Sequence, residues 1–136
     1  MRVNSKVFTE RMDMLDGIRI PNCPSSKIGG KSLRLVCENI MNMAMKPGYA
    51  PPSNYHNMTE LDKRLMLDYW REYDDLHQFV GDFRPFDEWF IHKATSSEVL
   101  RRAREWLGQH NYLIFDNDVV EHAQHAGRNM RQTIRQ

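Results

Sequence analysis

Apolar residues recur at helical spacing along most of this chain. Between residues 33 and 45 one side of a helix is formed by Leu33, Val36, Cys37, Ile40 and Ala44. Met41, Met43 and Met45 add apolar surface that could fill the core or form a binding patch. A wider stripe follows Asn57 and Glu60, a capping-box pair, and predicts the longest helix, ending at about Val80. Its apolar positions are Leu61, Leu65, Met66, Tyr69, Trp70, Tyr73, Leu76 and Val80. A stripe of this width is typical of a central helix that packs on two sides.

Helical patterns are also present toward both ends of the sequence. One helix is expected from Asn4 or Ser5 to about Asp16, and another from about Asn117 to residue 136. Together these patterns predict a mainly α protein. We expect one compact domain over residues 1–136, with five or six helices, a helix-turn-helix and room for one short β-hairpin.

Proline and glycine mark the connecting segments. The longest is residues 46–57, a Pro/Tyr-rich loop in which Tyr49 and Tyr55 could either dock the loop or form exposed contacts. Earlier in the chain, Gly30-Lys31-Ser32 matches only the tail of a phosphate-binding loop, because Ser25 occupies the position of the first glycine. The favoured interpretation is a glycine turn followed by Ser32 as a helix N-cap.

Residues 83–116 contain a short helix, a tight turn, a longer helix and a strand-like run at residues 112–115. In the short helix, Phe86, Trp89, Phe90 and Ala94 share one apolar face. Thr95-Ser96-Ser97-Glu98 fits a capping box, in which Thr95 ends the first helix and caps the second. The second helix, from Ser97 to Gln109, turns Leu100, Ala103 and Leu107 inward.

This order of elements, over residues 83–120, resembles a winged helix-turn-helix. The resemblance implies that the second helix enters the major groove of double-stranded DNA and that a β-hairpin wing follows it. The wing would pair residues 112–115 with Val119 and Val120. The implied function is a small DNA-binding regulatory module.

The arginines of the second helix are the first candidates for DNA contacts. Glu98 lies four residues before Arg102, and Arg101 lies four before Glu105, a spacing that stabilises a surface helix by ~0.2–0.5 kcal/mol per pair. Arg104 has no such neighbour and is expected to be the residue most available to phosphate or base. The predicted nucleic-acid contacts are Ser97, Arg101, Arg102, Arg104, Arg128 and Arg131.

The charge distribution supports an alternative function, a protein-binding regulator or inhibitor that occludes a partner without catalysis. The net charge is only +1, which disfavours strong non-specific binding to nucleic acid. Residues 58–83 hold three Lys/Arg and seven Asp/Glu, so the end of the long helix is acidic. The predicted protein contacts are Tyr49, Tyr55, Glu72, Asp74, Asp75 and Asp82.

Other function classes receive little support from the sequence. No apolar run approaches the ~20 residues of a membrane span, and no secretory signal is visible. Cys23 and Cys37 lack a disulfide framework pattern, so both are expected as free thiols in a cytoplasmic protein. His122 and His125 are one helical turn apart, but on a polar face such a pair is usually solvated. We therefore expect no catalytic residue, no metal and no cofactor.

Overall fold

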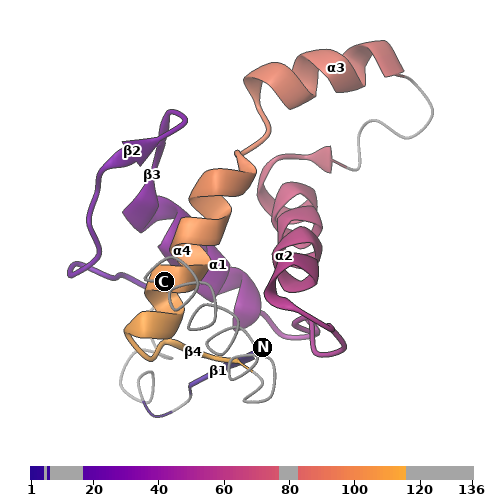
Figure 1. Ribbon diagram of the computed structural model, residues 1–136. Coiled ribbons are helices and arrows are strands. Elements are labelled where there is room, and N and C mark those ends of the chain that lie inside the picture. The colour runs from indigo at the N-terminus through magenta and orange to yellow at the C-terminus, as the bar shows by residue number, and fades with distance from the viewer. Residues whose placement is uncertain (5, 7–16, 77–82, 116–136) are drawn as a thin grey trace, which may run out of the picture.

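The computed structural model describes residues 1–4, 6, 17–76 and 83–115 of the chain (Figure 1). Within these ranges there are four helices, α1 (Leu33–Ala44), α2 (Met58–Tyr73), α3 (Phe83–His92) and α4 (Ser97–Gln109). Four strands of two residues each form two small antiparallel sheets. The mainly α class is confirmed, but a count of five or six helices is not supported. The helices expected over residues 4–16 and 117–136 fall largely or wholly outside the described residues.

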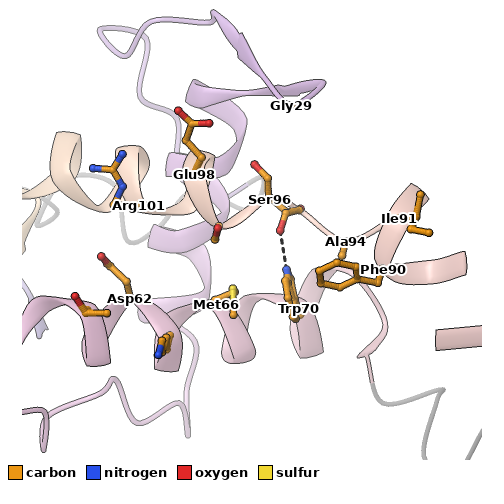
Figure 2. Close-up of a pocket in the computed structure, with 14 residues that line it drawn as sticks. Gly29, Asp62, Met66, Trp70, Phe90, Ile91, Ala94, Ser96, Glu98 and Arg101 are labelled. Carbon is orange, nitrogen blue, oxygen red and sulfur yellow. Dashed lines mark hydrogen bonds between the residues drawn. The ribbon is translucent and has the colours of Figure 1, made fainter. Parts of the chain in front are cut away.

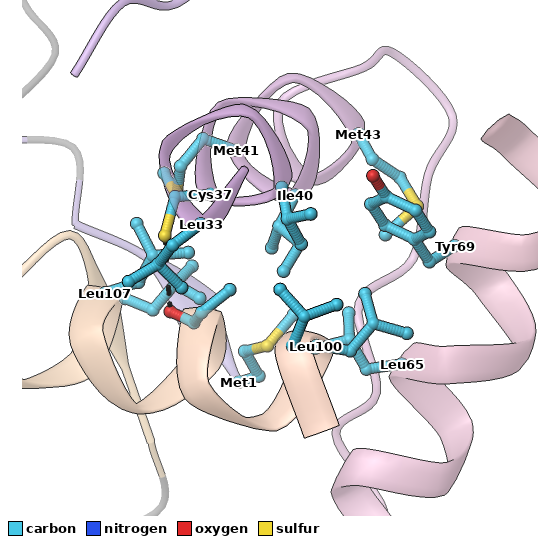
Figure 3. Packing of buried hydrophobic residues seen from close by; sticks show 14 of the residues in the cluster. Met1, Leu33, Cys37, Ile40, Met41, Met43, Leu65, Tyr69, Leu100 and Leu107 are labelled. Atoms are coloured by element: carbon cyan, nitrogen blue, oxygen red, sulfur yellow. Dashed lines mark hydrogen bonds between the residues drawn. The ribbon is translucent and has the colours of Figure 1, made fainter. Parts of the chain in front are cut away.

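The core lies between α1, α2 and α4, because α4 packs on both of the other helices. Figure 3 shows side chains of α1, including Ile40 and Met41, meeting Leu100 and Leu107 of α4. Leu65 of α2 belongs to the same fully buried group. Burying one such side chain contributes ~1.5–3 kcal/mol. The apolar stripes expected on these three helices therefore hold the fold together.

The helix N-termini are capped by polar side chains. The Ser32 hydroxyl accepts the backbone N–H of Leu35, which confirms it as the N-cap of α1. The Asn57 side chain accepts the N–H of Glu60 at 2.8 Å and caps α2. For α4 the prediction was one residue off, because Ser96, not Thr95, is the N-cap. Thr95 is instead buried and bonded to α2.

The helix α2 ends at Tyr73, seven residues earlier than the apolar pattern predicts. Asp75 takes a left-handed backbone conformation with φ of 59°, which a helix cannot continue through. Asp74 faces inward and bonds to the segment before α4, so tertiary contacts stop the helix here.

The two sheets differ from the expected wing. Strands β2 (Lys27–Ile28) and β3 (Lys31–Ser32) form a hairpin whose turn is made by Gly29 and Gly30, with φ of 58° and 83°. Positive φ at both central residues is the conformation that favours glycine in two-residue hairpins.

Strand β4 (Leu113–Ile114) pairs with β1 (Arg2–Val3) at the start of the chain. Val119 and Val120, the partners predicted for this strand, lie outside the described residues, within which β4 pairs only with β1. The partner is more than one hundred residues away in sequence, so no local pattern could indicate it.

Candidate functional site

Arg104 is buried in the helix interface and is not available to DNA. Its side chain is 9% exposed and makes two hydrogen bonds to the Asp62 carboxylate of α2, Nε to Oδ1 at 2.7 Å and Nη2 to Oδ2 at 2.8 Å. A paired, two-point contact of this kind is the geometry in which a guanidinium can be buried. The expectation that Arg104 is the most available arginine was wrong, because its partner lies 42 residues earlier in the chain.

The other predicted contacts on α4 are exposed. Arg102 bonds to Glu98 at 2.9 Å and Arg101 to Glu105 at 3.0 Å, the two pairs expected from the spacing. Ser97 is exposed at the first position of α4. Arg128 and Arg131 lie outside the described residues. The described part of α4 thus presents two ion-paired arginines to solvent.

The acidic residues at the end of α2 do not form one open surface. Asp74 is 5% exposed, and its carboxylate accepts the backbone N–H of Thr95 at 2.8 Å. Lys93 pairs with Asp75 at 2.7 Å, and Lys46 pairs with Glu72. Asp82 lies outside the described residues. The prediction of an acidic contact surface was wrong for Asp74, which instead joins α2 to the α3–α4 connection.

Both tyrosines of the Pro/Tyr-rich loop dock it onto the body of the protein. Tyr55 is buried, and the half-buried Tyr49 donates its hydroxyl to Asp68 of α2 at 2.8 Å. Burial and the neighbouring carboxylate raise the pKa of Tyr49. Of the two alternatives for this loop, docking is the one observed.

A groove of about 810 Å³ lies between α2 and α4, and α3 and the turn at Gly29 border it (Figure 2). We call it the α2–α4 groove. One end, the apolar end, is lined by Met66 and Trp70 of α2, by Phe90 and Ile91 of α3, and by Ala94. The other, the charged end, contains Thr59, Asp62, Lys63, Glu98 and Arg101. Figure 2 shows Asp62 and Arg101 toward one side of the groove and Phe90 and Ile91 toward the other.

Trp70 is a fixed part of the apolar end. Its indole Nε1 donates to the Thr95 carbonyl at 2.8 Å, and its ring meets Trp89 edge-on at 5.4 Å between centroids. Trp89 in turn donates its indole N–H to the Asp74 carbonyl. These bonds tie α2, α3 and the start of α4 together. A bound group would therefore meet a preformed wall.

Phe90 and Ile91 are open to solvent beside this wall. Their exposed fractions are 52% and 71%, and together with Leu35 at 52% they are the most exposed large apolar residues among those described. Phe90 touches Trp70 edge-on, with ring centroids 5.9 Å apart. The sequence placed Phe90 on a buried face and did not single out Ile91. The run Trp89-Phe90-Ile91 was the available signal, since three consecutive apolar residues cannot share one helix face.

The charged end carries one cation without a described partner. Asp62 is bonded to Arg104, Glu98 to Arg102 and Arg101 to Glu105. Lys63 is exposed, and among the described residues no carboxylate lies within ion-pair distance of it. The charged end and its ion-pair partners hold four cations and three anions, so Lys63 provides an excess positive charge.

The two cysteines are free, as expected from the sequence. Both are also buried, Cys23 included, and their sulfur atoms lie 3.6 Å apart. Burial raises the pKa of both thiols. Their reactive thiolate form is therefore suppressed, which disfavours a nucleophilic role. Among the described residues no group of three or more His, Cys, Asp or Glu side chains is placed to hold a metal ion. His122 and His125 lie outside that part of the chain.

The chain matches no protein-family model, no curated protein and no solved structure. None of the described helices combines the length and apolar character that a bilayer crossing requires.

Proposed function

We propose that this protein is a small protein-binding module, and that the α2–α4 groove accepts an apolar segment of its partner protein. The observation that carries the proposal is the exposure of Phe90 and Ile91 directly beside the buried wall formed by Trp70. Exposed apolar side chains that cluster around a groove are typical of interaction sites. In the unbound protein these two side chains are hydrated, and a partner that covers them would gain ~25 cal/mol for each Å² of apolar surface removed from water.

The size and shape of the groove suit a peptide segment. Its volume of about 810 Å³ lies within the ~300–1,000 Å³ typical of binding pockets. Two helices, α2 and α4, form its walls, and grooves of this kind commonly take an amphipathic helix with its apolar face inward. The aromatic side chains Trp70 and Phe90 supply the kind of anchor that dominates binding energy at protein interfaces.

Binding of this kind supports a regulatory or inhibitory role without catalysis. While the module covers an apolar segment of its partner, that segment cannot bind any other molecule. No chemistry by the module is needed for such occlusion.

The test is selection of peptides against the immobilised protein from a phage-displayed library of random 12-residue sequences. We expect enriched peptides rich in aromatic and aliphatic residues, which lose most of their affinity for Ile91→Asp. The control is Leu35→Asp, which introduces the same charge at an exposed leucine of α1 outside the groove. Selected peptides that bind Ile91→Asp as well as wild type would refute the proposal. Thermal melts of both variants establish that each is folded.

DNA binding is a second candidate, favoured by the exposure of Arg102 on α4 and of Arg101 and Ser97 at the edge of the groove. With Arg104 buried, this candidate depends on these residues together with Arg128 and Arg131. A titration against mixed duplex DNA at two salt concentrations distinguishes the two functions, because phosphate contacts make binding strongly salt-dependent. Salt-dependent binding that Arg101→Glu and Arg102→Glu weaken, and that Ile91→Asp leaves unchanged, would favour the DNA-binding function.

A further inference from the structure

We infer that the α2–α4 groove selects partner segments that carry a carboxylate at a fixed distance from an apolar anchor. This inference deepens the proposed function and rests on it. The apolar anchor would occupy the end lined by Trp70, Phe90 and Ile91, and the carboxylate would face Lys63. The occupant is thus an acidic, amphipathic segment of a partner protein.

The argument begins with the register of α2. Thr59, Lys63, Met66 and Trp70 lie at i, i+4, i+7 and i+11, which places all four on one face of the helix. All four line the groove. A ligand lying along α2 therefore passes from Lys63, which has no ion-pair partner among the described residues, to the indole wall without leaving the groove.

The charges around Lys63 determine which ligand group suits the charged end of the groove. Every other charged residue at the charged end is engaged in an ion pair within the chain, and the Asp62 pair is largely buried. A ligand carboxylate would meet the excess positive charge of Lys63, whereas a ligand cation would be repelled by it. Because Lys63 is exposed, the attraction contributes selectivity more than affinity.

The helix also fixes the spacing of the two ligand groups. Lys63 and Trp70 are seven residues apart, which corresponds to about 10 Å along α2 at ~1.5 Å per residue. A helical ligand covers the same distance with an acidic residue seven positions from its apolar anchor. An extended ligand covers it in about three positions, at ~3.3 Å per residue.

The experiment repeats the phage selection on wild type, on Lys63→Glu and on Arg2→Glu. Arg2 is an exposed cation of β1, and it is not among the residues that line the groove. Peptides selected on wild type should carry Asp or Glu either seven positions from the apolar anchor, as in a helical ligand, or about three positions from it, as in an extended ligand. Selection on Lys63→Glu should instead favour Lys or Arg at the same position, and selection on Arg2→Glu should repeat the wild-type result. A synthetic wild-type-selected peptide should bind Lys63→Ala about 1.5- to 5-fold more weakly than wild type, the range expected for an exposed ion pair.

The outcomes separate this inference from the function on which it rests. Peptides that depend on Ile91 but show no acidic preference, and that bind Lys63→Glu equally well, would overturn the inference and leave the groove as a binding site. A selection that enriches no Ile91-dependent peptide would overturn both.

Discussion

Replacing Arg104 with Met removes the cation from the buried ion pair between α4 and α2 while keeping most of the apolar stem. The Asp62 carboxylate would then lose two hydrogen bonds, of 2.7 and 2.8 Å, in a position where it is only 21% exposed. Breaking a fully buried pair by removing one partner costs ~3–5 kcal/mol. Water can reach one side of Asp62, so we expect a loss of about 2–3 kcal/mol, which is less than the cost for a fully buried pair.

The matched control is Arg102→Met on the same helix. Arg102 pairs with Glu98 at 2.9 Å, but both side chains are more than half exposed. Exposed pairs of this kind contribute ~0.3–0.5 kcal/mol, so the control should be close to wild type.

Urea denaturation followed by circular dichroism measures both free energies of unfolding. In a thermal melt, we expect Arg104→Met to lower Tm by roughly 6–12 °C for a chain of this size. The double variant Asp62→Leu with Arg104→Met should recover part of the loss, because no unpaired charge is left at the interface. Equal losses for the Arg104 and Arg102 variants would refute the reasoning, since they would mean that burial adds nothing to the Arg104 pair.

Two further predictions concern stability. Asp74→Ala should lower the free energy of unfolding by ~1–3 kcal/mol, measured by urea denaturation, because the buried N–H of Thr95 loses its acceptor. The control Glu72→Ala should change this free energy little. A larger loss for Glu72→Ala than for Asp74→Ala would contradict the role assigned to Asp74. Burial raises the pKa of Tyr69 and of Tyr73 to about 12 in the folded protein, from ~10 in an unfolded chain. The unfolded state then binds fewer protons between these values, so the free energy of unfolding should be unaffected below about pH 10 and fall from there to about pH 12. Urea midpoints between pH 9 and 11.5 measure the decline. Midpoints that stay level in wild type, or that decline equally in the Tyr69→Phe/Tyr73→Phe variant, would count against it.

The parts of the fold that could be predicted from the sequence are those specified by neighbouring residues. The inward faces of α1 and α4 follow from helical periodicity, and the caps at Ser32 and Asn57 follow from their own side chains. Asn111, just after α4, takes a left-handed conformation with φ of 63°, which Asn tolerates at the end of a helix.

The errors have one physical cause, a partner that is distant in sequence. The spacing rule for charge pairs considers only residues three or four positions apart in one helix, so it classed Arg104 as unpaired. The actual partner, Asp62, lies on a different helix, α2. The apolar pattern extended α2 to Val80, since nothing local indicated that Asp74 would turn toward Thr95. For the groove, the pattern showed that Phe90 was apolar but not that α3 would turn Trp89 inward and leave Phe90 outside.

The pairing of β1 with β4 also constrains the order in which the protein can form during its synthesis. Val3 and Leu113 are opposite each other in the sheet but 110 residues apart in the chain. At a translation rate of ~5–20 residues per second, roughly 5–20 s pass between the addition of one residue and the addition of the other. During that time α1, α2 and α3 are made and β1 has no partner strand. The sheet is therefore a late structure that joins the first residues to the nascent protein only after the last helix of the core, α4, has been synthesised.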